Sequence, residues 1–243
     1  MFGWGLALLT MAGFCSLGVW QLDRGRQKEA MLAEANAVLA APVPLALAAA
    51  SDPARAGSYD WAQGKGRFTS APAVLLDNQG YQGRPGIRVL RVFQPDAVAM
   101  PLLVDLGWLP LPGDRRLPVI DSWPDTYFVA GLLAPPPSAG LASAVAVPQA
   151  DGNLLVTSLD RAVLGAALKL PALAPRLLRL DPALRIGYAR DLEILPNTLA
   201  PERHLGYAVQ WFGLALAVFI TALVLTLRKR RQRRNAAREK IAP

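Results

Sequence analysis

The sequence predicts a membrane protein in which two transmembrane α-helices, one near each end, flank a strand-rich α+β domain outside the cytoplasm. Three observations predict it. Met1–Val19 and Tyr207–Leu227 contain no charged residue. Short β-type runs, separated by turn residues, fill the middle of the chain, as is typical of strands. A cationic cluster, Arg228–Arg231, follows the second uncharged stretch, and such clusters remain on the cytoplasmic side of a membrane.

The first uncharged stretch is predicted to be a retained transmembrane helix. Trp4 and Trp20 flank it as interfacial anchors would. The competing interpretation is a cleaved signal peptide, but the stretch lacks a basic start and a convincing small-x-small cleavage site. Cys15 is the only cysteine, and Phe14 stands where a lipidation site needs a small residue. Leu22–Leu39 is rich in Ala, Leu, Glu and Gln, so the helix is expected to continue outward.

The second stretch sets the predicted topology. The 21 residues Tyr207–Leu227 span roughly 30 Å as a helix, the thickness of a bilayer's hydrocarbon core. The cationic tail then predicts cytoplasmic termini, and the lack of an Arg-rich amphipathic leader favours the bacterial inner membrane. Arg24, Arg26 and Lys28 count against this topology because they would lie outside, but they are three charges against eight. The predicted boundaries are 1–21 for the first transmembrane helix, 22–203 for the periplasmic α+β domain, 204–227 for the second transmembrane helix and 228–243 for the basic cytoplasmic tail.

The charge distribution argues against a nucleic-acid partner. The net charge is +8, but residues from Arg228 onward contain eight Lys or Arg and one Glu, which leaves a net +1 for the rest. The basicity therefore belongs to a tail rather than to a domain surface. After a membrane helix such a tail indicates topology and attraction to anionic headgroups of the lipid bilayer.

The middle of the chain is predicted to alternate strands and turns. Pro42, Pro44 and Ala46–Pro53 are interpreted as a linker, and Pro135–Ala144 as an exposed loop. A helix is predicted at Ser158–Leu170, with Ser158 or Asp160 as its N-cap and Pro171 after it. Strands are predicted at Trp61–Phe68, Ala73–Leu76, Ile87–Phe93, Leu102–Leu109, Tyr127–Leu133, Leu154–Val156 and Arg176–Leu180, and turns at Asp77–Gly80, Arg84–Gly86 and Leu111–Asp114.

The residues offer little support for an enzyme. His204 is the only histidine, which excludes a multi-histidine zinc site. No nucleophile-elbow glycines frame a serine, and no phosphate-binding Gly loop is present. Asp121 and Asp125 could be imagined as an acid/base pair, but their setting beside Pro124 is more typical of a turn. We therefore expect no catalytic residues.

The candidate site lies at the outer membrane edge. His204, Tyr207 and Trp211 follow i, i+3, i+7 spacing and share a helix face, with Gln210 on a flanking face. Trp20 and Gln21 end the first span at the predicted depth of His204. A neutral imidazole in an aromatic-lined cleft between helices suits axial ligation of a haem iron. Interfacial anchoring alone remains the alternative.

At these residues the chain resembles the surfeit locus family, the Surf/Shy-type assembly factors of haem-copper cytochrome c oxidase. The resemblance covers nearly the whole chain. It rests on Gly18–Arg24 with Lys28, on Leu76-Asp77-Asn78 followed by Pro85-Gly86, on Gly107-Trp108-Leu109-Pro110, on Val129-Ala130-Gly131, and on Pro201 with His204–Phe212.

The resemblance implies an assembly factor without enzymatic activity that helps to insert or stabilise haem a in the oxidase catalytic subunit. It implies that His204 is the haem ligand, that Trp20, Tyr207 and Trp211 are membrane-edge aromatics, and that a haem-a-synthesising protein is a further partner. The alternative is a scaffold that docks oxidase subunits through its outer domain and never holds haem. The chain departs from the family at Asp105-Leu106, where the family usually has Asn-Arg, so a partner contact there is in doubt.

Overall fold

The computed structural model describes residues 2–96, 98–123, 125–137, 144–194 and 199–239. The chain divides into two compact units. One, the helical unit, comprises Met1–Met31 and Thr198–Pro243, and the other, the central domain, comprises Leu32–Asn197. The long helix α1 (Phe2–Ala40) contributes to both, and α3 (Pro201–Glu239) forms the rest of the described helical unit.

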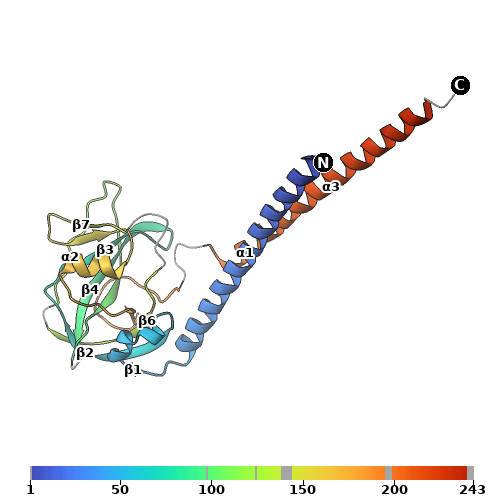
Figure 1. The fold of residues 1–243 in the computed structure, drawn as a ribbon. Coiled ribbons are helices and arrows are strands. Elements are labelled where there is room, and N and C mark those ends of the chain that lie inside the picture. Colours follow the sequence, from blue (N-terminus) through green and yellow to red (C-terminus); the bar gives the residue numbers. More distant parts are fainter. Residues whose placement is uncertain (1, 97, 124, 138–143, 195–198, 240–243) are drawn as a thin grey trace. The chain divides into compact units, whose positions relative to one another are not determined.

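The sheet of the central domain closes on itself (Figure 1). Its strands pair in the order β1-β2-β6-β9-β5-β4-β3-β8-β7, and β2 also pairs with β4. The extra pairing joins β2, β6, β9, β5 and β4 into a ring without a free edge, from which β3, β8 and β7 extend. The strands are β1 (Leu45–Ala46), β2 (Asp60–Phe68), β3 (Val74–Tyr81), β4 (Arg84–Pro95), β5 (Leu102–Pro110), β6 (Thr126–Ala134), β7 (Ala146–Pro148), β8 (Leu154–Val156) and β9 (Leu177–Leu180).

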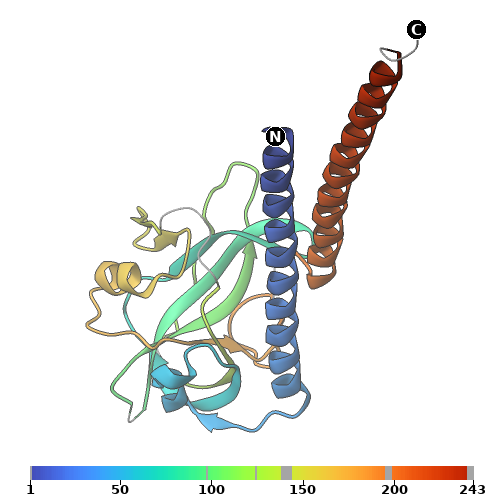
Figure 2. The same cartoon turned by 45° about the vertical axis from the view of Figure 1, so that its right-hand side comes forward.

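The sheet buries its interior and part of its opposite face. Side chains that alternate along the ring strands fill its interior, among them Phe93, Val104 and Leu178. The opposite face, including Leu90 and Leu103, packs under helix α2, which Figure 2 shows in yellow beside the long curved strands in green. Burial on alternate faces is what the period of a strand requires. The strand-rich domain predicted between two apolar helices is thus observed.

The connections differ from the predicted turns in two places. Asp77–Gly80 lies within β3, where the register with β4 shifts and Asn78 has a positive φ of 57°. The chain reverses instead at Gln82-Gly83, both with positive φ, as a two-residue hairpin turn requires. Arg84–Gly86 therefore begins β4 rather than forming a turn. The residues of Asp77–Gly80 are typical of a turn, but a β-bulge within a strand uses the same residue types.

The predicted linker is partly structured. Its residues form β1 and the short helices η1 (Leu47–Ser51) and η2 (Pro53–Arg55), and Leu47 and Ala50 are buried in the barrel core. The linker interpretation rested on the prolines and alanines of this segment. The predicted helix at Ser158–Leu170 is shorter, because α2 (Arg161–Leu168) begins after Asp160, whose carboxylate accepts the Val163 N–H.

Charged side chains connect the residues around η1 and η2 with Arg176, which directly precedes β9. Arg55 and Arg176 both donate hydrogen bonds to the Asp60 carboxylate, and Arg176 also donates to the Ala49 carbonyl oxygen. Burial by itself would raise the pKa of Asp60, but the two guanidinium groups outweigh it and hold that pKa below its usual value. Asp60 thus remains ionised, and its pairing keeps the buried Arg176 compensated.

The last turns of α1 belong to the central domain. Ala35 is buried with Tyr59 and Leu132, and Glu34 accepts the backbone N–H of Tyr59 at 3.1 Å. The predicted continuation of the first helix beyond its apolar stretch is confirmed, since α1 runs without interruption to Ala40.

Both long helices are apolar and long enough to cross a membrane, at Gly3–Ala40 and Pro201–Asn235. Most of their large apolar side chains are exposed, including Leu9, Val209 and Leu225. Exposed apolar side chains in such number are costly in water. Length and composition are therefore those of a membrane protein with a domain between its two terminal helices.

Candidate functional site

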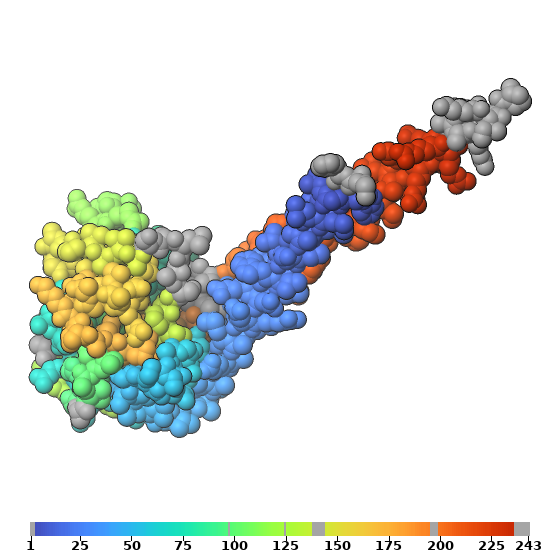
Figure 3. Space-filling model, viewed as in Figure 1, coloured from blue at the N-terminus to red at the C-terminus, as the bar shows by residue number. Residues whose placement is uncertain are grey.

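The candidate site lies where α1 and α3 pair. Trp4 Nε1 donates to Thr226 Oγ1 at 2.9 Å, and the rings of Phe14 and Trp211 lie 5.6 Å apart. Further along, Gln21 meets His204. The α3 numbers fall as the α1 numbers rise, so the helices are antiparallel. Figure 3 shows the blue and red surfaces of α1 and α3 in contact.

The contact surface, called the seam here, repeats every three or four residues on each helix. This spacing keeps one stripe of each helix against its partner and is typical of antiparallel helix pairs. Residues between these positions are mostly exposed. The seam residues, all buried or half-buried, are Trp4, Ala7, Met11, Phe14, Gly18, Gln21, Gly25 and Lys28 on α1, and Pro201, His204, Ala208, Trp211, Ala215, Val218 and Ala222 on α3.

Two glycines let the helices approach closely. A Cβ atom at Gly18 would lie 2.7 Å from the Phe212 ring, and one at Gly25 would lie 3.4 Å from the His204 Cβ. Small residues at a helix contact bring the two backbones together. Gly25 therefore places α1 directly against the first turn of α3, where His204 lies.

His204 is held in one orientation by Gln21. Its side chain is only 5% exposed, and its Nδ1 lies 2.7 Å from the Gln21 Oε1 atom. Because an amide oxygen can only accept, Nδ1 carries the proton and donates it. Nε2 then keeps its lone pair. That atom is buried and has no hydrogen-bond partner among the residues that the structure describes.

An imidazole in this state is suited to bind a metal. Histidine ligands commonly donate one ring N–H to an oxygen acceptor, which fixes the tautomer and directs the other nitrogen at the metal. A buried nitrogen without a partner is otherwise a cost to the fold. Within the described residues no group of three or more His, Cys, Asp or Glu could hold a metal ion, but an iron carried in a macrocycle needs only an axial ligand from the protein.

Cations lie beside this pair. Lys28, 8% exposed, donates from Nζ to the Leu199 carbonyl oxygen at 2.6 Å. Arg24 and Lys28 are both close enough to the His204 ring to act on it electrostatically. Arg24 Nη1 also donates to Gln27 Oε1 at 3.2 Å. This end of the seam is thus polar, whereas the part from Ala7 to Gly18 is apolar.

The other sequence-predicted residues are divided between two surfaces. Trp211 lies in the seam against Phe14, on the same face as His204. Tyr207 and Trp20 are 40% and 57% exposed, and Gln210 is also exposed, so these three lie outside the seam. The predicted shared face holds for His204 and Trp211, but it is wrong for Tyr207, which lies outside the seam.

Sequence reasoning missed two residues of the site. Gly25 was treated as an ordinary helix residue and Lys28 as part of a family motif and a charge count. Their signal was the spacing Gly18, Gln21, Gly25, Lys28, which alternates steps of three and four. This period is hard to recognise here, because from Gln21 to Lys28 the seam positions and the exposed positions both include polar or charged residues.

A comparison with protein families shows the family of the chain. The family model described as the SURF1 family matches residues 8–216. The chain belongs to the SURF1 family. The match includes most of α1, the whole central domain and the first part of α3 with His204. No curated protein matches the chain.

Members of the SURF1 family are associated with the assembly of cytochrome oxidase and are not known as enzymes. The expected family resemblance is therefore confirmed. The helices that carry its first and last motifs, Gly18–Arg24 and His204–Phe212, are the two that form the seam.

The departure from the SURF1 family pattern at Asp105-Leu106 lies within strand β5. Asp105 is buried and Leu106 is fully buried in the barrel. The Asp105 carboxylate lies 2.7 Å from Arg88 Nη1 and 3.8 Å from Arg179 Nε. Both residues therefore act inside the domain, Asp105 as the centre of a group of ion pairs and Leu106 as a core side chain.

Proposed function

We propose that the protein is an assembly factor for haem-copper cytochrome c oxidase that assists the insertion or stabilisation of haem a in the catalytic subunit. Its membership of the SURF1 family supports a role in oxidase assembly. It performs no bond chemistry itself, and its partners are the oxidase catalytic subunit and a haem-a-synthesising protein.

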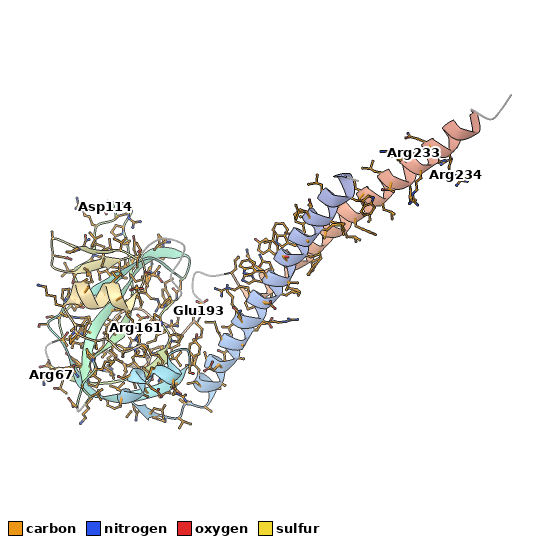
Figure 4. All side chains as sticks on the ribbon, in the orientation of Figure 1. Arg67, Asp114, Arg161, Glu193, Arg233 and Arg234 are labelled. Carbon is orange, nitrogen blue, oxygen red and sulfur yellow. The ribbon has the colours of Figure 1, made fainter. Side chains whose placement is uncertain are left out.

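In this proposal α1 and α3 cross the bacterial inner membrane and the central domain is periplasmic. Their length and their exposed apolar side chains support two crossings. The cations Arg233 and Arg234 lie on the part of α3 that continues past the first residues of α1 (Figure 4). A cationic helix end of this kind remains in the cytoplasm, which supports cytoplasmic termini and a position of His204 at the periplasmic edge.

The observation that carries the proposal is the state of His204. Its Nδ1–H is bound to Gln21, and its Nε2 is buried without a partner among the described residues. The residues present thus fit an axial ligand of a haem iron, with Gln21 fixing the tautomer. Bound haem would be the cargo that the oxidase needs as its redox centre.

The surrounding residues would hold the macrocycle and limit its residence. Trp211 and Phe14 form an apolar wall within the seam, and the exposed rings of Trp20 and Tyr207 offer flat surfaces at the same end of the helices. Because Nε2 is buried, α1 and α3 must separate locally before iron reaches it. That cost weakens binding, which suits a protein that must release its cargo.

The test is the haem content of the full-length protein purified from cells that make haem a. We expect a Soret band that falls at least about tenfold in His204→Ala, since no other histidine can replace the lost ligand. Gln210→Ala is the matched control, because Gln210 lies on the same helix but is exposed. It is expected to retain the band.

A Soret band of equal intensity in His204→Ala would remove His204 from the proposal. If the wild type carries no haem, and truncations of the central domain abolish oxidase assembly while His204→Ala does not, then the protein is a scaffold that docks oxidase subunits. The two outcomes are separated by measuring pigment and oxidase level in the same strains.

A further inference from the structure

The cations that follow the apolar stretch of α1 are not explained by topology. Arg24, Arg26 and Lys28 follow the first apolar stretch, and under the proposed topology they lie on the side where positive charge is disfavoured. Two of them have contacts that point to a common role. Arg26 differs, because its charge is satisfied by Asp23 at 3.6 Å and both side chains are largely exposed.

The helix spacing places Arg24 and Lys28 beside His204. Gln21 and Gly25 both contact His204, and Arg24 lies between them in the chain, three residues after Gln21. Lys28 lies one turn further along and reaches the residue two positions before α3, Leu199. Arg24 and Lys28 therefore form a positive edge next to the imidazole.

Neither cation has an acidic partner among the described residues of the helical unit. Lys28 uses one of its three donors on the Leu199 carbonyl oxygen, and Arg24 uses one N–H on the neutral amide of Gln27. Donors therefore remain on both side chains. The buried ammonium group of Lys28 is costly without an anion, and an anionic ligand would remove that cost.

We propose that Arg24 and Lys28 bind the two propionate carboxylates of a haem whose iron is held by His204. This inference rests on the proposed function and adds a second set of contacts to the same site. A macrocycle bound at the membrane edge must direct its carboxylates toward water and its apolar edge toward lipid. Arg24 can hold a carboxylate with two parallel hydrogen bonds, and Lys28 can hold one as a point charge.

The experiment compares two probes, iron protoporphyrin IX and its dimethyl ester, in titrations of the full-length protein in detergent. Esterification removes both carboxylate charges and leaves the iron and the ring unchanged. We expect the wild type to bind the free acid at least about tenfold more tightly than the ester, because the loss of even one charge-assisted hydrogen bond predicts that factor and the ester lacks both carboxylates. Arg24→Gln and Lys28→Gln should each reduce this preference toward one.

The ratio of the affinities for the two probes separates a loss of carboxylate binding from a change in structure. A substitution that merely disturbs the helix pair weakens the binding of both probes equally and leaves the preference for the free acid unchanged. Arg26→Gln is the matched control, since it removes a cation from the same segment but one that is paired with Asp23, and it should retain the tenfold preference.

Three results would overturn the inference. The wild type could bind both probes equally, or the Arg24 and Lys28 variants could keep the full preference. In either case the proposed function would survive if binding still required His204. Failure of the wild type to bind either probe would contradict the proposed function itself, and the inference with it.

Discussion

Asp105→Asn is expected to destabilise the central domain by about 3–5 kcal/mol, the usual effect of removing one partner from a buried ion pair. Asn has the same shape and can still accept the Gly107 N–H, which Asp105 Oδ1 accepts at 3.0 Å. It carries no charge, however. Arg88 and Arg179 would then share only Asp191, at 3.9 Å from each and partly exposed.

The pKa of Arg179 shows why the lost charge matters. Burial lowers this pKa, and the charge of Asp105 is the first influence that opposes the effect. Without Asp105 both guanidinium groups remain charged in a poorly solvated place. Urea unfolding of the full-length protein in detergent, followed by tryptophan fluorescence, measures the change.

Asp77→Asn is the matched control for this substitution. Asp77 also pairs with an arginine, Arg115, at 2.7 Å, but that arginine is largely exposed. Exposed pairs contribute about 0–1 kcal/mol, so the control should unfold within about 1 kcal/mol of the wild type. If Asp105→Asn behaved like the control, the buried cluster would not be an important source of stability.

Gly107→Ala is expected to cost about 2–6 kcal/mol, the sum of backbone strain and overpacking of about 1–3 kcal/mol each. Gly107 has φ of +117°, which side chains rarely tolerate. A Cβ there would lie 2.7 Å from the Ala189 carbonyl oxygen. That oxygen accepts the Trp108 N–H at 2.7 Å, so the added methyl group would also disrupt this contact.

Gly83→Ala separates the two causes. Gly83 also has a positive φ, of +75°, but a Cβ there would meet no atom within 4 Å. Only the backbone term remains, of about 1–2 kcal/mol. The same urea titration measures both variants, and equal losses in the two would mean that close packing at Gly107 contributes nothing.

Much of the fold could be predicted from local patterns. Leu154–Val156 was predicted with the bounds that β8 has, and Trp61–Phe68 with bounds one residue short of β2, because short β-type runs separated by turn residues are a local signal. Closure of the barrel was not predictable. It depends on pairing Phe68 with Phe93, two residues whose sequence contains no mark of that distant partner.

The candidate site shows the same division. The sequence predicted two membrane-edge ends, and the structure places Gln21 against His204. The sequence could not show that Gln21 accepts a hydrogen bond from His204 Nδ1, or that Tyr207 lies outside the seam. Both depend on the rotation of each helix about its axis. Within a lipid-exposed helix, apolar residues surround the axis, and rotation is set by close contacts such as that of Gly18 with Phe212.

The most direct test of the central claim uses the fact that His204 is the only histidine. Full-length protein labelled with ¹⁵N-histidine gives ring-nitrogen signals from this residue alone. The account predicts a protonated Nδ1 and a bare Nε2 without haem, with the Nε2 signal shifted or broadened by the iron when haem is added. A protonated Nε2, or an Nε2 signal that haem leaves unchanged, would contradict it.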